Sequence, residues 1–211
     1  MKIISTNLGK PTTILWKGET EKTGIFKYPS DEPLFLGKTD VKGDSVIDRV
    51  HHAGVNKACY LFASYHYPYW KEKYPDLDWD WGMFGENLTV EGLDESVIRI
   101  GNVYKIGTAL VQVSQPREPC YKLGIRFKNQ DIVKQFVDHS HPGTYVRILE
   151  EGAVKQGDEM KLMERSDNPL TVQDFYRLIY ARPKPQATLK LFMENLAVPQ
   201  YKKDRFRKYL V

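Results

Sequence analysis

The sequence lacks any long apolar run. No segment approaches the roughly 20 apolar residues of a membrane-spanning helix, and the first residues, MKIISTNLGKP, contain only a two-residue apolar run. A secretory signal peptide needs an apolar stretch of about 7–15 residues. We therefore expect a cytoplasmic protein with no membrane partner, in which the two cysteines, Cys59 and Cys120, are reduced thiols.

Several common functional motifs are also missing. The chain has no glycine-rich nucleotide-binding pattern and no serine nucleophile elbow, and it has no Cys-x-x-Cys or His-x-x-x-His pair of the kind that holds zinc. Two cysteines are too few for an iron–sulfur cluster. The net charge of +4 suits an anionic ligand, but it is too small to indicate a nucleic-acid partner by itself.

The chain does contain many short β-type segments separated by turns. Its 211 residues, 41% hydrophobic and 27% charged, have the composition of a globular protein. Residues 2–6, 12–16 and 23–29 read as strands, and residues 96–114 read as strands folded back on each other around a Gly101-Asn102 turn. This pattern predicts a mainly β (α+β) fold built on a β-barrel.

A few helices are expected beside the strands. Apolar residues at helical spacing predict one helix over residues 56–66 and another near 130–138, with Asn129 as its N-cap. After Arg165 the pattern changes to three short helices, the first opened by a capping-box-like Thr171 and Asp174. We predict a barrel domain over 1–165, with its core at about 20–165, and a small three-helix unit over 166–211.

The stretch QPREPCYKL, residues 115–123, is the strongest candidate for chemistry. Pro116 and Pro119 restrict the backbone on both sides of the loop. Arg117 and Lys122 place positive charge near Cys120, which favours the thiolate that attacks electrophiles or binds metals. The alternative is a turn whose cysteine packs inward, and local chemistry leaves both open. Cys59, in an apolar stretch, is expected to pack in the core.

Other candidates are weaker alone. The stretch DRVHHAGVNKA contains His51 and His52, which as neighbours on a strand would face opposite sides. Lys27 also reads as a solvated strand lysine, and Asn87 as a turn residue. The basic C-terminal run of Lys202, Lys203, Arg205, Arg207 and Lys208 reads as a solvated helix face before it reads as a nucleic-acid or redox-partner surface.

In this order, the stretches TGIFKYP, DRVHHAGVNKACYLF, FGENLTVEGLDE, VQVSQPREPCYKL and ILEEGAVKQGDEM resemble the MOSC domain, the family named after the C-terminal part of molybdenum cofactor sulfurase. Their spacing is similar to that of the bacterial YiiM-type branch, known for resistance to hydroxylaminopurine, and residues 166–211 resemble its C-terminal three-helix appendage. One departure is Ala53-Gly54, where the family often has Gly-Gly.

The resemblance implies a mixed β-barrel that binds the molybdenum cofactor, molybdopterin with molybdenum, with Cys120 as the metal ligand and catalytic residue. It places Lys27 and Arg49 near the cofactor phosphate or pterin, while His51, His52 and Asn87 lie in matching motifs without an assigned role. We add Arg117 and Lys122 as cofactor-binding residues on electrostatic grounds.

The implied function is reduction of small N-hydroxylated compounds, such as hydroxylaminopurine-type bases and amidoximes. Because the chain has no flavin or nicotinamide fingerprint, a separate flavin or iron–sulfur protein has to deliver the electrons. The alternatives are a cofactor or sulfur carrier with Cys120 as its thiol, and a binding module without chemistry. Homodimerisation stays open.

Overall fold

The computed structural model describes residues 1–45 and 54–211. Its main feature is one eight-stranded mixed sheet, in the order β12-β8-β9-β10-β6-β7-β1-β4, with small two-stranded ribbons β2-β3 and β5-β11 beside it. The strands are β1 (Lys2–Gly9), β2 (Thr12–Trp16), β3 (Glu19–Thr23), β4 (Lys27–Pro29), β5 (Leu34–Leu36), β6 (Cys59–Ala63), β7 (Leu88–Glu91), β8 (Val103–Ile106), β9 (Ala109–Pro116), β10 (Thr144–Glu150), β11 (Gly152–Val154) and β12 (Met160–Glu164).

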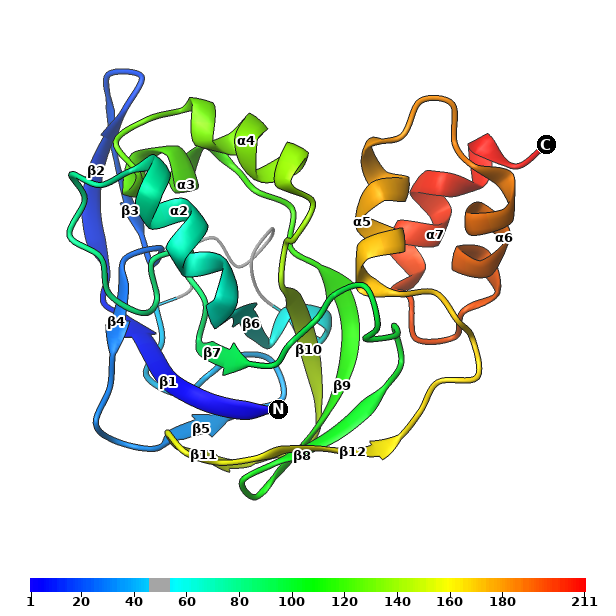
Figure 1. Cartoon of the computed structure of the whole chain (residues 1–211), viewed down its shortest axis with the longest axis horizontal. Helices are drawn as coiled ribbons and strands as arrows, with labels where there is room; N and C mark the ends of the chain where they lie inside the picture. The colour runs from blue at the N-terminus through cyan, green and yellow to red at the C-terminus, as the bar shows by residue number, and fades with distance from the viewer. Residues whose placement is uncertain (46–53) are drawn as a thin grey trace.

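The sheet curls until β1, its next-to-last strand, reaches the residues that lead into β12. The N-terminal residues of β1 pair with the residues that lead into β12 through a Lys2–Glu159 bridge. The amide of Ile3 donates to Asp158 O at 2.9 Å, and the amide of Gly157 donates to Ile3 O at 2.8 Å. The predicted α+β, mainly β architecture is confirmed, and these contacts give the sheet its barrel-like curvature (Figure 1).

The described residues form six α-helices: α2 (Tyr67–Lys73), α3 (Tyr121–Arg126), α4 (Asp131–His139), α5 (Val172–Tyr180), α6 (Gln186–Glu194) and α7 (Gln200–Phe206). Helices α2, α3 and α4 gather on one side of the sheet, and α5, α6 and α7 form a separate group at the C-terminus (Figure 1). No described helix is long and apolar enough to cross a membrane.

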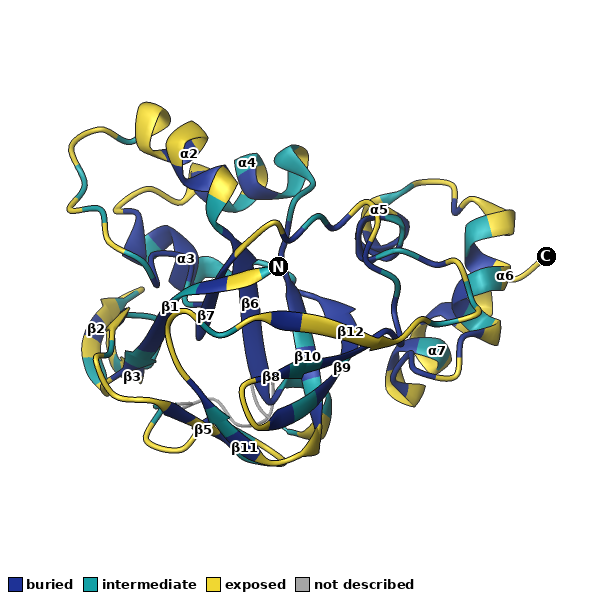
Figure 2. Ribbon diagram, turned by 60° about the horizontal axis from the view of Figure 1, so that its bottom comes forward, coloured by how far each residue is buried: buried dark blue, intermediate teal, exposed yellow. Residues whose placement is uncertain are grey.

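The predicted helix over residues 56–66 is wrong. This segment forms a 3-10 turn at Val55–Lys57, strand β6 with all five residues buried, and a second 3-10 turn at Ser64–His66. Strand β6 is central and covered on both faces (Figure 2). Cys59, Leu61 and Ala63 point into the barrel core, whereas Tyr60 and Phe62 pack with aromatic residues of the α2–α4 side. Burial on both faces removes the alternation that marks a half-exposed strand.

Two smaller predictions also need correction. The hairpin turn between β8 and β9 lies at Gly107-Thr108, because Ile106 pairs with Ala109, and Gly101-Asn102 precedes β8. The N-cap of α4 is Gln130, although Asn129 Oδ1 still accepts a hydrogen bond from the Asp131 amide at 2.9 Å.

The C-terminal helices share one core with the sheet. The capping box of Thr171 and Asp174 at the start of α5 is present as predicted. Apolar side chains of α5, α6 and α7, including Phe175, Phe192 and Phe206, belong to the same buried cluster as the barrel core. The three-helix group is therefore packed against the sheet and can contribute to a site there.

Candidate active site

Cys120 lies between β9 and α3, in the loop that the two prolines restrict. It occupies the N-cap position of α3 with extended dihedrals (φ −133°, ψ 174°), and it is partly exposed. Cys59 is buried in β6, and burial raises the pKa of its thiol, so it packs in the core as predicted. Both cysteines are among the described residues, and neither forms a disulfide.

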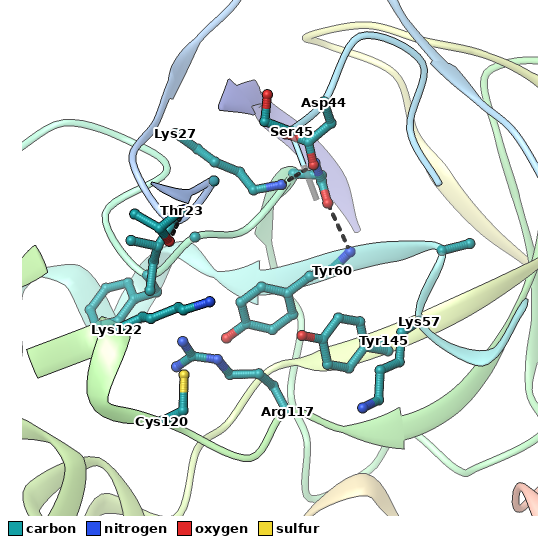
Figure 3. A pocket seen from close by; sticks show the side chains of 16 residues that line it. Thr23, Lys27, Asp44, Ser45, Lys57, Tyr60, Arg117, Cys120, Lys122 and Tyr145 are labelled. Atoms are coloured by element: carbon teal, nitrogen blue, oxygen red, sulfur yellow. Dashed lines mark hydrogen bonds and ion pairs between the residues drawn. The ribbon is translucent and has the colours of Figure 1, made fainter. Parts of the chain in front are cut away.

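Cys120 lines a pocket formed by segments from across the chain (Figure 3). One wall comes from residues 23–27 between β3 and β4, and others come from residues 84–87 before β7 and from β6 and β10. Gly24 allows a close backbone approach there, because a Cβ at Gly24 would lie 1.5 Å from Ser45 O. The pocket lining consists of Thr23, Gly24, Ile25, Lys27, Asp44, Ser45, Lys57, Ala58, Tyr60, Phe84, Gly85, Asn87, Arg117, Cys120, Lys122 and Tyr145.

The structure brings five of the predicted site residues together around this pocket: Lys27, Asn87, Arg117, Cys120 and Lys122. The other three, Arg49, His51 and His52, lie outside the described residues. The individual roles of all eight stay predictions.

Lys27 is not a solvated strand lysine. Its side chain is buried, and Nζ forms an ion pair with the buried carboxylate of Asp44. The same carboxylate accepts hydrogen bonds from Asn87 Nδ2 at 2.9 Å and from the Gly9 amide at 2.9 Å. Asn87 Oδ1 accepts from the Tyr60 amide at 3.2 Å, so this network links the loop before β7 to β6.

Arg117 is the most unusual cation of the pocket. Its guanidinium lies over the rings of Tyr60 and Phe136, at 5.6 and 5.2 Å from their centroids, and its Nη1 is buried without a hydrogen-bond partner among the described residues. Burial works to lower the pKa of Arg117, but the neighbouring Tyr60, Tyr145 and Cys120 raise it above its usual value. Arg117 therefore stays charged, with one donor still to be satisfied.

Among the described residues, the pocket lining has more cationic than anionic side chains. Its described lining includes the side chains of Lys27, Lys57, Arg117 and Lys122, against the one carboxylate of Asp44. In Figure 3 the sulfur of Cys120 lies beside the guanidinium of Arg117, and Lys122 also lines the pocket. An anionic ligand that reaches this pocket meets several cations at once, which favours its binding.

The loop before β7 is held by a buried carboxylate. Glu86 is fully buried and accepts hydrogen bonds from the Gly82 and Phe84 amides at 3.0 and 3.1 Å and from Thr89 Oγ1 at 2.8 Å. The phenol of Tyr67 also donates to it. Burial raises the pKa of Glu86 despite these donors. Its role is to fix the loop that presents Phe84, Gly85 and Asn87 to the pocket.

The C-terminal helices hold the cysteine loop from outside. Buried Lys202 of α7 forms an ion pair with Glu118, and Arg205 Nη1 lies 3.7 Å from the same carboxylate. Tyr201 OH donates to Gln115 Oε1 at 2.7 Å. Lys202 is therefore not part of a solvated helix face, which corrects the interpretation of the basic C-terminal run at this position.

Sequence reasoning missed Asp44, Lys57, Tyr60 and Tyr145. Asp44 follows a Lys-Gly pair that reads as an ordinary turn, and the tyrosines stand in strands where aromatic residues are common. Lys57 belongs to the DRVHHAGVNKA stretch, where it is one more cation beside the histidine pair. No local feature of the sequence marks these four residues as pocket residues, so only the fold shows that they line the pocket with Cys120.

Comparison with known proteins matches the MOSC domain model to residues 48–161, more than half of the chain. The chain belongs to the MOSC domain family. This family is associated with binding of the molybdenum cofactor. The matched range includes the Cys120 loop and the pocket residues on β6 and β10.

Individual relatives agree with this assignment. YflK from Bacillus subtilis is 35% identical over 206 residues, covering 98% of this chain and 93% of that protein. A protein named "Reductase" from Gibberella moniliformis is 34% identical over 84% of this chain, but the match spans only 31% of that longer protein. The crystal structure of YiiM from Geobacillus stearothermophilus superimposes with a TM-score of 0.83 at 34% identity, covering 100% of this chain and 99% of that one.

Proposed function

We propose that the chain binds the molybdenum cofactor with Cys120 as a metal ligand and reduces N-hydroxylated compounds, using electrons from a separate protein. The observation that supports this most is the placement of Cys120 in a pocket whose described lining holds four cations, one of which has a buried guanidinium nitrogen with no hydrogen-bond partner among the described residues. The association of the MOSC family with this cofactor and the relative named "Reductase" add support.

The residues present fit such a cofactor. A thiolate suits a soft, sulfur-coordinated metal, and Cys120 is the one described pocket residue with a thiol. A terminal phosphate needs cations or N–H donors, which Lys27, Arg117 and Lys122 supply. Arg117 Nη1, which has no partner among the described residues, offers a donor that a bound anion would satisfy.

When bound, the cofactor would supply a two-electron redox centre for the overall conversion of R–NHOH, two electrons and two protons into R–NH₂ and water. The protein's own residues bind and orient. Burial and Cys120 raise the pKa of Tyr145 to about 12, although Arg117 lowers it, so its hydroxyl stays protonated as a donor beside the pocket. The Lys27–Asp44–Asn87 network fixes the opposite wall.

The decisive experiment is metal analysis of protein expressed in a host that makes the cofactor. We expect near-stoichiometric molybdenum per chain in the wild type and little in Cys120→Ala, because the thiolate ligand is lost. Cys59→Ala is the matched control, since Cys59 lies in the core and should leave the molybdenum content unchanged. Equal molybdenum in wild type and Cys120→Ala would contradict the ligand assignment.

Activity separates the reductase from the carrier. Loaded protein, reduced with a small artificial donor, should convert hydroxylaminopurine to adenine-type product, and Cys120→Ala should not. If the loaded wild type binds molybdenum and transfers its cofactor to an acceptor protein without converting the substrate, the carrier alternative replaces the reductase.

A further inference from the structure

Outside the Cys120 pocket, three histidines and one glutamate gather where three connecting segments meet. His66 ends the 3-10 turn before α2, Glu95 lies in the loop after β7, His139 ends α4, and His141 lies in the loop before β10. The ring centroids of His66 and His141 are 4.3 Å apart. None of these residues lines the Cys120 pocket.

The two histidines His66 and His141 point their nitrogens at one carboxylate oxygen. His141 Nδ1 lies 3.2 Å and His66 Nε2 lies 3.6 Å from Glu95 Oε2, and one ligand atom from each of the three residues lies within 4.8 Å of the others. A regular tetrahedron with metal–ligand bonds of about 2.0–2.1 Å separates its ligand atoms by about 3.4 Å. The two separations from Glu95 Oε2 bracket that value.

The atoms behind these groups hold them in this orientation. The Gly143 amide donates to Glu95 Oε1 at 2.9 Å, which leaves Oε2 for the histidines. His66 Nδ1 lies 3.1 Å from His139 Nε2, and a hydrogen bond from His66 Nδ1–H to His139 leaves the lone pair on His66 Nε2. Such hydrogen bonds to the second ring nitrogen are typical of metal-binding histidines.

A simple ion pair explains the cluster less well. His66 is 4% exposed, yet its Nε2 has no hydrogen-bond partner in the described part of the chain and lies beyond hydrogen-bond distance of Glu95. A buried nitrogen without a partner is costly. A shared cation would satisfy this nitrogen together with His141 and Glu95.

We propose that His66, Glu95 and His141 form a binding site for one zinc-type divalent transition-metal ion. Two imidazoles and one carboxylate suit zinc and its neighbours rather than magnesium or calcium, which prefer oxygen ligands. The His141 side chain is 27% exposed, so the ion has a route to the site and a fourth position for water. This site does not depend on the proposed reductase function.

The ion would connect parts of the fold that shape the Cys120 pocket. Pro142, next to His141, accepts a hydrogen bond from Tyr60 OH at 2.8 Å, and Tyr60 lines the pocket. The Gln173 amide of α5 donates to Glu95 O at 3.0 Å, which joins the C-terminal helices to the same cluster. Metal at this site therefore stabilises the junction between the sheet and the C-terminal helices.

The test titrates chelator-treated protein with zinc chloride and, separately, with cobalt chloride. We expect one ion per chain and the visible absorption of tetrahedral cobalt. His141→Ala, in which a partly exposed ligand is lost, should bind at least about 100-fold more weakly, since even loss of a supporting hydrogen bond costs about 10- to 100-fold. Glu95→Gln, of almost the same size, should also weaken binding, and His139→Phe should weaken it about 10-fold or more.

Two controls make the outcome decisive. Asp138→Asn removes an exposed carboxylate next to His139 at the end of α4 and should bind zinc like the wild type. Cys120→Ala should do the same, whereas zinc lost in Cys120→Ala and kept in His141→Ala would place the ion in the other pocket and overturn the proposal. Absence of zinc binding by the wild type at micromolar concentrations would also overturn it. The melting temperature of metal-free His141→Ala verifies that this variant folds.

Discussion

The Cys120 pocket and the His66–Glu95–His141 cluster differ in the kind of polar atom that their described residues leave without a hydrogen-bond partner. The described lining of the pocket includes Lys27, Arg117 and Lys122 against the carboxylate of Asp44, and Arg117 Nη1 has no hydrogen-bond partner among the described residues. The cluster has lone pairs around one buried carboxylate, and Nε2 of His66 has no hydrogen-bond partner among the described residues. Surplus donors favour an anion and surplus lone pairs favour a cation, so the comparison indicates two different ligands in one small protein.

The largest effect should come from changing the only described carboxylate of the pocket. Asp44→Asn leaves Lys27 buried without its counterion, and breaking a buried ion pair costs about 3–5 kcal/mol of unfolding free energy. Urea denaturation measures this cost. Without the carboxylate of Asp44, the charge of Lys27 is no longer balanced. We therefore expect pyrophosphate, used as a probe for the cofactor's phosphate, to stabilise Asp44→Asn more than the wild type.

Asp138→Asn is the matched control for this change. It breaks the exposed Lys134–Asp138 pair, whose side chains are 82% and 58% exposed, and should cost less than about 1 kcal/mol. Equal losses of unfolding free energy in the two variants would show that the buried Lys27–Asp44 pair stabilises the fold no more than an exposed ion pair does.

Changing Arg117 should have the opposite effect on stability. Arg117→Met keeps an unbranched apolar side chain between Tyr60 and Phe136 but removes a buried charge that has no counterion among the described residues. We expect the cofactor-free Arg117→Met variant to be at least as stable as the cofactor-free wild type. It should bind pyrophosphate about 10- to 100-fold more weakly, because it lacks a charge-assisted hydrogen bond that contributes about 1.5–3 kcal/mol.

Calorimetry of pyrophosphate binding tests the affinity, with exposed Arg165→Met as the control. Unchanged affinity in Arg117→Met would place the anion elsewhere. A large loss of stability would show that the guanidinium stabilises the fold itself, and the contrast with Asp44→Asn would then disappear.

The pocket and the cluster also differ in how much of each could be predicted from the sequence. The Pro-Arg-Glu-Pro-Cys stretch is continuous, so its two prolines, cation and thiol can be recognised together, and the turns and alternating strands indicate the β architecture. Strand β6 was predicted as a helix because both of its faces are buried, and no periodicity separates the two structures there.

The polar groups that the fold brings together from distant segments could not be predicted from the sequence. Asp44 meets Lys27 only because Gly24 allows the backbone of Ser45 to come close. Glu95 and His141 are 46 residues apart, and no local spacing connects them. Single carboxylates and histidines acquire a role only when the sheet register and the connecting loops place them together, and none of that is encoded in local spacing.

The smallest effect should come from the contact between the C-terminal helices and the cysteine loop. Lys202→Met removes the ion pair with Glu118 but leaves Arg205 near that partly exposed carboxylate, so we expect a loss of about 1 kcal/mol. Looser anchoring should make Cys120 in cofactor-free protein react about fivefold faster with iodoacetamide. Exposed Lys208→Met is the control and should react like the wild type.

Zinc affinity should stay unchanged in Lys202→Met, because its contacts end at the pocket loop. A change in zinc affinity without a change in thiol reactivity would mean that α7 supports the histidine cluster rather than the cysteine loop.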